Sequence, residues 1–237
     1  PPLAFLTYRF GISAFVAIVL LSFFGFHFPK DKKTQAELFL YGFITSTVTL
    51  GFLFFGQEKT TALDATLITL MSPLLISLAG VRFLKERITL KEKIGMAIAF
   101  LGTILTIIEP FLQNGHSLTR FSGNILVFIS LFVAAWGAIL AKRLLRANVD
   151  PLTLTSFSFI IGFITLLPFT LFTVHYSLFT IHYSYHLGVI FMALVSGSLA
   201  YFLANKAQKT IEISEAAVFY YLYHILAAPL AVVWLGE

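Results

Sequence analysis

Polar side chains inside long apolar runs are the residues of this sequence that can do chemistry. Arg9 lies in the first run and His224 in the last, and two hydroxyl clusters, 45–47 and 196–198, lie in the middle of two others. A charged or hydrogen-bonding group in apolar surroundings is costly unless it has a partner. These residues therefore indicate that a polar group is bound away from water.

The two ionisable residues each have two interpretations. Arg9 lies roughly 10 Å along its run, at ~1.5 Å per residue. Its guanidinium either holds a carboxylate as a bidentate fork or snorkels to the nearer interface. His224 either changes charge near neutral pH during a cycle or stays neutral and bonds to a neighbouring helix. Tyr220 lies one helical turn before His224, and we expect the two to share a lining face.

Further polar and aromatic residues are candidates for a site because of their depth in the apolar runs. Ser46, Ser196 and Ser198 lie at equivalent depths, and they either line a cavity for a polar solute or let helices pack closely. Trp136 lies in mid-run, where it either walls the apolar part of a solute or packs between helices. Pro73 weakens its helix, which permits either bending or a fixed kink.

Composition places the chain in a membrane. Of 237 residues, 58% are hydrophobic and 11% are charged, and the mean hydropathy is +0.91. A soluble domain carries about 25% charged residues, so a water-soluble globule of this size cannot bury so much apolar side chain. The chain has no cysteine and hence no thiolate metal site. We expect neither a metal nor a cofactor.

Eight runs approach the ~20 apolar residues that a helix needs to cross a bilayer. They lack the alternation of barrel strands, so the predicted class is an all-α polytopic membrane protein. The predicted spans are Leu3–Phe26, Gln35–Phe55, Ala62–Leu84, Lys91–Ile108, Gly123–Leu144, Pro151–Thr173, His186–Asn205 and Ile213–Leu235.

Lysine and arginine set the orientation of these spans. Thirteen of the sixteen cations lie in alternate connections, two lie in the connections between them, and Arg9 lies inside a span. The basic side is predicted to be cytoplasmic, with both observed termini on the opposite side. The net charge of +5 is therefore a topology signal, and no nucleic-acid partner is expected.

The sequence matches itself at an offset of about 150 residues. Matching pairs include Pro2 with Pro151, Ser46 with Ser196, Lys59 with Lys209 and Glu86 with Glu237. Equivalent spans are separated by an odd number of crossings, so the two copies are predicted to run in opposite directions, a pattern typical of transporters with a site near the midplane. We assign residues 1–110 and 122–237 to the two copies. One further helix at each end would complete an inverted five-plus-five bundle.

Several motifs resemble those of the EamA-type ten-helix carriers of the drug/metabolite transporter superfamily. The motifs are Ala65–Pro73, Phe83–Arg87 and Lys93–Gly95 with Gly102, and then Leu199–Asn205, Ser214–Val218, Ala227–Leu230 and Trp234–Glu237. The resemblance implies a two-fold-related bundle around a central cavity. The family usually has a proline in mid-helix before each glutamate motif. Pro73 takes that place in the first copy, but His224 takes it in the second.

The resemblance also implies a function. It is that of a secondary transporter that exports or exchanges small organic metabolites, amino acids or similar, across the bacterial inner membrane, with protons as a possible coupling ion. An intramembrane enzyme acting on a lipid-linked substrate is the competing interpretation. Such an enzyme needs acid, base or metal groups at one depth, whereas Arg9 and His224 lie at different depths. The expected partners are a small-molecule solute and membrane lipid.

Overall fold

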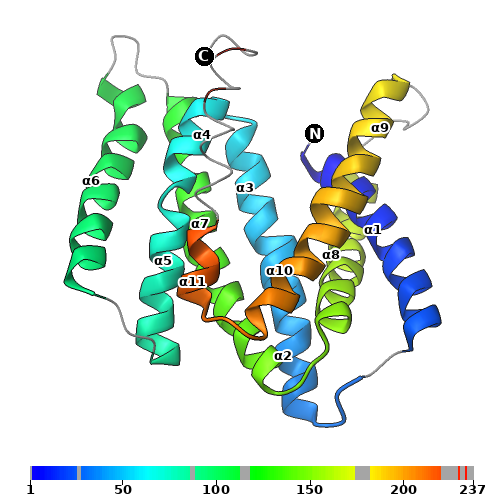
Figure 1. Ribbon diagram of the computed structural model, residues 1–237. Coiled ribbons are helices and arrows are strands. Elements are labelled where there is room, and N and C mark those ends of the chain that lie inside the picture. The colour runs from blue at the N-terminus through cyan, green and yellow to red at the C-terminus, as the bar shows by residue number, and fades with distance from the viewer. Residues whose placement is uncertain are drawn as a thin grey trace. The chain divides into compact units, whose positions relative to one another are not determined.

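A computed structural model gives the fold (Figure 1). It describes residues 2–25, 28–85, 89–112, 118–173 and 182–219, together with Pro229 and Val233. Every regular element in these residues is helical, which confirms the all-α class. The elements are α1 (Pro2–Phe24), α2 (Lys32–Gly42), η1 (Phe43–Thr49), α3 (Leu50–Gln57), α4 (Ala62–Thr69), α5 (Ser72–Ala79), η2 (Gly80–Leu84), α6 (Leu90–Leu112), α7 (Leu118–Arg146), α8 (Pro151–Thr173), α9 (Tyr183–Phe191), η4 (Met192–Leu199), α10 (Ala200–Gln208) and α11 (Ile213–Val218), where η marks π-helical segments.

Six helices of the described residues are long and apolar enough to cross a membrane. They are Pro2–Phe24, Lys32–Gln57, Ala62–Leu84, Leu118–Arg146, Pro151–Phe172 and Tyr183–Gln208, and six of the predicted spans correspond to them. The predicted span Lys91–Ile108 lies in α6, whose shorter apolar stretch is Phe100–Pro110. The predicted span Ile213–Leu235 begins with α11 and lies mostly outside the described residues.

Helix boundaries recur along the chain at a nearly constant offset. The corresponding starts are Pro2 and Pro151, Lys32 and Tyr183, Phe43 and Met192, Leu50 and Ala200, and Ala62 and Ile213. These positions are 149 to 151 residues apart, close to the offset of the sequence matches. The π-helical segments η1 and η4 are one of these pairs, and each interrupts a long helix near its middle.

The chain divides into two compact units. Unit 1 comprises Pro1–Gly51 and Leu140–Thr210, and unit 2 comprises Phe52–Ile139 and Ile211–Glu237. Each unit therefore takes segments from both of the predicted sequence copies. The candidate cavity described below lies wholly in unit 1.

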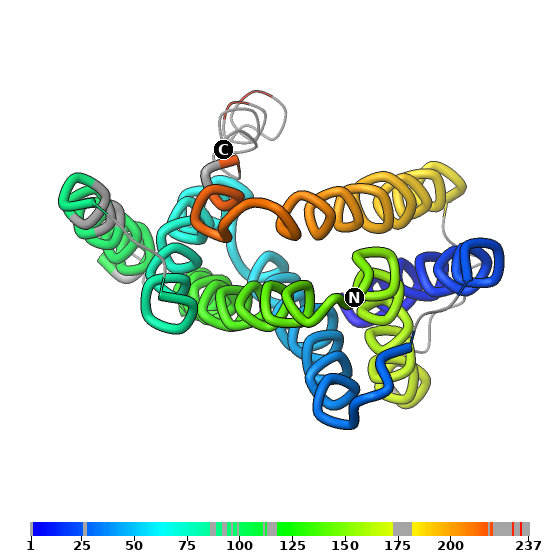
Figure 2. Tube along the Cα trace, turned by 60° about the horizontal axis from the view of Figure 1, so that its bottom comes forward, coloured from blue at the N-terminus to red at the C-terminus, as the bar shows by residue number. Residues whose placement is uncertain are grey.

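Unit 1 is built around α8, which packs against α1, α2, η1 and α10. α1 packs against α8 (Figures 1 and 2), and the ring centroids of Phe10 and Phe159 are 5.9 Å apart between them. Gly162 permits the close approach, because a Cβ there would lie 2.7 Å from Ser46 Cβ and 3.0 Å from the Phe10 ring. Small residues at such crossings let membrane helices pack tightly.

Unit 2 has an apolar core between α4, α5, α7 and α11. Its buried residues include Ile68, Leu75, Val127, Ile139 and Ile213. The span 62–84 is broken in this core, because α4 ends at Thr69 and α5 begins at Ser72 with Pro73 in its first turn. Proline is tolerated in a first turn, where its missing N–H costs no helical hydrogen bond.

A charged cluster joins the helix ends of unit 2. Arg120 of α7 donates from Nε and Nη2 to the Asp64 carboxylate of α4, both at 2.8 Å. The same Nη2 lies 2.9 Å from Oε2 of Glu109 in α6, and Asn124 Nδ2 donates to Asp64 Oδ2 at 2.9 Å. Because these partners neutralise Arg120, α7 extends to Leu118, five residues before its predicted start.

The tight crossing at Gly162 generates a stability prediction. Gly162→Ala should lower the free energy of unfolding by about 1–3 kcal/mol, because the new methyl overlaps Ser46 and Phe10. Gly51→Ala is the matched control: nothing lies within 4 Å of its Cβ position, so the change should raise that free energy by roughly 0.5–1 kcal/mol. Reversible unfolding in mixed micelles measures both. Equal effects of the two substitutions would contradict the packing described.

Candidate solute-binding cavity

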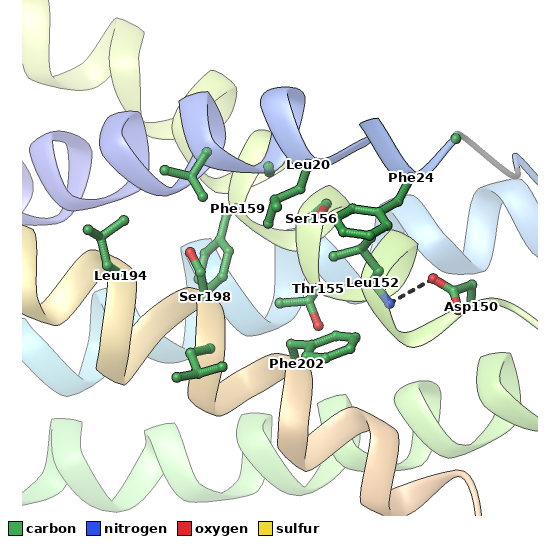
Figure 3. Close-up of a pocket in the computed structure, with 14 residues that line it drawn as sticks. Leu20, Phe24, Asp150, Leu152, Thr155, Ser156, Phe159, Leu194, Ser198 and Phe202 are labelled. Carbon is green, nitrogen blue, oxygen red and sulfur yellow. Dashed lines mark hydrogen bonds between the residues drawn. The ribbon is translucent and has the colours of Figure 1, made fainter. Parts of the chain in front are cut away.

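A cavity of about 600 Å³ lies within unit 1 (Figure 3). Its walls come from the second half of α1, the first half of α8, and η4 with the start of α10. Most of the lining is apolar, including Leu20, Phe24, Phe159, Leu194 and Phe202. Sites for small molecules typically have volumes of about 300–1,000 Å³ and mainly apolar walls with a few polar groups.

Helical periodicity explains which residues reach the cavity. On α1 the lining residues Val16, Leu20 and Phe24 are four apart and therefore share one face. Phe15 and Ile18 lie on the same helix but point away and are exposed. On α8 each of the lining residues 152, 155, 156 and 159 has another three or four positions away, and they also share one face.

Three hydroxyl groups lie in the lining, and they differ in their partners. Thr155 accepts from Asn205 Nδ2 at 2.9 Å and donates to the Pro151 carbonyl at 2.8 Å. Ser198 Oγ donates to the Ala193 carbonyl at 3.0 Å. Ser156 has no hydrogen-bond partner among the described residues, so its hydroxyl is available to a ligand.

Asp150 marks one end of the cavity. Its carboxylate accepts from the backbone N–H of Leu152 at 2.9 Å (dashed in Figure 3) and of Thr153 at 3.2 Å, and so caps α8. A carboxylate is favourable at a helix N-terminus because of the helix dipole. Asp150 follows the basic end of α7, where Arg143 and Arg146 lie in the last turn.

Arg9 lies beyond the other end of the cavity. It shares a face of α1 with Ser13 and with Ala17, which lines the cavity. Its Nη2 is 3.7 Å from the position that a Cβ on Gly197 would take. Gly197 directly precedes Ser198 in η4. The guanidinium thus lies next to a segment that lines the cavity.

The predicted serines have different positions in unit 1. Ser198 lines the cavity. Ser196, two residues earlier in η4, is exposed and does not line it. Ser46 is buried against Gly162 in the crossing of η1 and α8, which fits the packing interpretation of this residue.

Trp136 borders a separate, smaller hollow of about 240 Å³ in unit 2. Its ring meets the Phe83 ring edge-on, with centroids 5.3 Å apart. Ala79 and Ile139 are among the other lining residues. Pro73 is buried after the break between α4 and α5. The predicted residues Tyr220 and His224 lie outside the described residues.

Several lining residues were not identified from the sequence. Thr155, Ser156 and Asp150 were missed, together with the aromatic residues Phe159 and Phe202. One signal was present: four hydroxyl residues lie within positions 153–158, in the first turns of a predicted span. The apolar residues carry no such signal, because a lining phenylalanine and a core phenylalanine have the same sequence pattern.

Membrane-length helices with an internal cavity define a multi-pass integral membrane protein that can hold a small molecule. The EamA-like transporter family model matches residues 1–108 and 121–237. The chain belongs to this family, as its motifs predicted.

Several curated proteins are similar to this chain. The uncharacterized transporter YyaM of Bacillus subtilis is 26% identical over 224 residues, which cover 92% of this chain and 72% of YyaM. An uncharacterized transporter of Archaeoglobus fulgidus is 31% identical over 171 residues, 71% of this chain and 57% of that protein. The uncharacterized transporter YetK of Bacillus subtilis is 28% identical over 166 residues, 69% of this chain and half (50%) of YetK.

The different bonding of two neighbouring hydroxyls can be tested. Thr155→Val should lower the free energy of unfolding by about 1–3 kcal/mol, because it leaves the buried Asn205 amide without its acceptor. Ser156→Ala should change it by no more than about 0.5 kcal/mol, because no described group bonds to that hydroxyl. Unfolding in mixed micelles measures both. A loss for Ser156→Ala as large as that for Thr155→Val would mean that the Ser156 hydroxyl is structural.

Proposed function

We propose that this chain acts as a secondary transporter that exports or exchanges small organic metabolites, amino acids or similar, across the bacterial inner membrane by alternating access. The observation that carries the proposal is the cavity of about 600 Å³ among helices of membrane-spanning length. A carrier needs a site that holds its solute and opens to each side in turn. Membership of the EamA-like family and the names of the relatives support the same class.

We propose further that residues 1–110 and 122–237 are inverted copies in a five-plus-five bundle, of which this chain carries eight spans. The recurrence of five helix starts at an offset of 149 to 151 residues supports two copies. Inverted copies supply two near-equivalent shapes, one for each side of the membrane.

The cavity residues are the proposed contacts of the solute. Ser156 and Ser198 offer hydroxyls, and the apolar walls hold the rest of the molecule. Among the other predicted contacts, Arg9 is taken up below. Ser46, Ser196, Trp136, Tyr220 and His224 stay predictions.

Bending of helices is the proposed route to alternating access. The break before Pro73 and the π-helical segments η1 and η4 interrupt the regular i→i−4 ladder. Helices bend most readily where this ladder is interrupted. We therefore assign Pro73 to a gating position.

The proposal is tested by measuring solute exchange in a variant whose cavity is partly filled by a larger side chain. In proteoliposomes, the wild-type chain should exchange radiolabelled solutes from a metabolite panel. Leu20→Trp should lower the rate by about 5- to 150-fold, because the larger side chain takes up space that the solute needs; this range corresponds to a loss of about 1–3 kcal/mol of solute binding. Ile18→Trp is the matched control, because Ile18 lies on the same helix but points away from the cavity and is 56% exposed. It should leave the rate unchanged.

Two results would contradict the proposal. Equal rates for Leu20→Trp and Ile18→Trp would show that the solute does not use this cavity. Turnover of a lipid-linked substrate without flux of any metabolite would favour the intramembrane enzyme.

Proton coupling through His224 generates a separate prediction. If His224 carries the coupling proton, His224→Ala should abolish exchange driven by a pH gradient while solute counterflow without a gradient continues. His182→Asn is the control, because asparagine also caps a helix and the change removes a different histidine, at the start of α9. Unchanged pH dependence in His224→Ala would reject proton coupling at this residue.

A further inference from the structure

Arg9 is a buried cation that lacks a counter-charge among the described residues. It is only 4% exposed, and its Nε is buried without a hydrogen-bond partner. The ion pairs found in the described part of the chain are Arg120 with Asp64, Arg120 with Glu109, and Arg143 with Glu37, none of which includes Arg9.

Burial of such a group without compensation is costly. A guanidinium stays protonated in proteins and has five N–H donors that require acceptors. Removing its charge from water costs several kcal/mol unless an opposite charge and hydrogen bonds replace the water. At 4% exposure Arg9 is not a snorkelling side chain, because a snorkelling head group remains in water. The site therefore favours an anion that is not part of the described chain.

The surroundings of Arg9 place it beside η4, a segment that lines the cavity. Gly197 is its close neighbour in η4, at 3.7 Å from its Cβ position to Arg9 Nη2. The residues Leu194 and Ser198, on either side of Gly197 along the chain, line the cavity. Ser13 Oγ, one turn along α1, donates to the Ala193 carbonyl at 3.1 Å, and as a neutral hydroxyl it offers Arg9 no counter-charge.

The residues that line the cavity limit the kind of anion that can pair with Arg9. Its described lining contains no lysine or arginine, so a group with two negative charges would lack a second cation. A carboxylate carries one charge and matches the fork of the guanidinium with two parallel hydrogen bonds. The apolar walls formed by Leu20, Phe24 and Phe159 fit a hydrocarbon or aromatic body.

We propose that the solute of this chain is a carboxylate with an apolar body, whose carboxylate pairs with Arg9 while the body occupies the cavity between α1, α8 and α10. This inference rests on the proposed function, because the anion is taken to be part of the transported solute. Arg9 then determines specificity: uncharged analogues of equal size leave its charge without a partner and bind more weakly.

Paired probes test the proposal on the purified chain. The probes are phenylacetate with phenylacetamide and 4-methylpentanoate with 4-methylpentanamide. Binding is read as the ligand-induced rise in Tm in detergent, and transport is read as counterflow in proteoliposomes. At least one carboxylate should raise the Tm and exchange across the membrane, and its amide should bind about 10- to 100-fold more weakly.

Variants at Arg9 separate recognition from structure. Arg9→Met should abolish the preference for the carboxylate and should also raise the Tm of the ligand-free chain, because an apolar side chain replaces an uncompensated charge. Arg9→Lys keeps the charge but loses the fork, so it should retain the preference with weaker binding. Thr7→Val is the matched control, because Thr7 is buried on the same helix and hydrogen-bonded to Thr170 at 2.6 Å. It should lower the Tm without changing the preference.

The outcomes distinguish the two proposals. Carboxylate-specific binding that depends on Arg9, without flux of any solute, would retain the anion site and reject transport. Flux of solutes that Arg9→Met leaves unchanged would retain transport and reject the anion site. The anion site is also rejected if every carboxylate and its amide give equal shifts, including no shift at all. If Arg9→Met fails to fold, Arg9→Lys tests the anion site. Weaker binding of the carboxylate with a retained preference over the amide supports the site, and unchanged carboxylate binding rejects it.

Discussion

The absence of water inside the bilayer is the constraint on which this structure depends. Within a span, each polar group needs a partner inside the protein. Unit 1 meets this requirement by bonding helix to helix: Thr7 with Thr170, Thr47 with Thr165, Ser13 with the Ala193 carbonyl, and Asn205 with Thr155. These bonds join α1, η1, η4 and α10 to one another or to α8 at defined depths. Among the described residues, three buried side-chain atoms remain without a hydrogen-bond partner, Arg9 Nε, Thr49 Oγ1 and Gln208 Oε1, and of these Arg9 carries a charge.

The same bonds explain how a cavity persists among apolar helices. An empty space in a core normally costs stability, since its lining loses packing contacts. Here α8 is held to α10 through Asn205 and to α1 through the Phe10–Phe159 contact. The α1 side chains that line the cavity, such as Leu20 and Phe24, are mainly aliphatic or aromatic. The space has polar groups only at a few points, which suits a molecule that is apolar over most of its length.

The spans were predictable because an apolar run of sufficient length has few alternatives to a membrane helix. The ends of the spans were harder to predict. Helix α7 begins before Gly123 because Asp64 neutralises Arg120. Helix α10 extends past Asn205 to Gln208, whose carbonyl accepts from Lys142 Nζ at 2.6 Å. Such partners are distant in sequence. The sequence singled out Arg9 and Ser198 as candidate contacts, but depth alone did not separate Ser198, which lines the cavity, from Ser196, which does not. That difference follows from helical geometry, because residues two apart do not share a face of a helix.

Protection of a cavity residue by a solute tests the central claim most directly. The chain has no cysteine, so Ser198→Cys introduces a single thiol in the cavity, and Lys33→Cys introduces one at the exposed start of α2. The rates at which a small methanethiosulfonate reagent modifies these thiols are compared with and without saturating phenylacetate. The account predicts slower modification at position 198 and an unchanged rate at position 33. An unchanged rate at position 198, in a chain that binds phenylacetate, would contradict it.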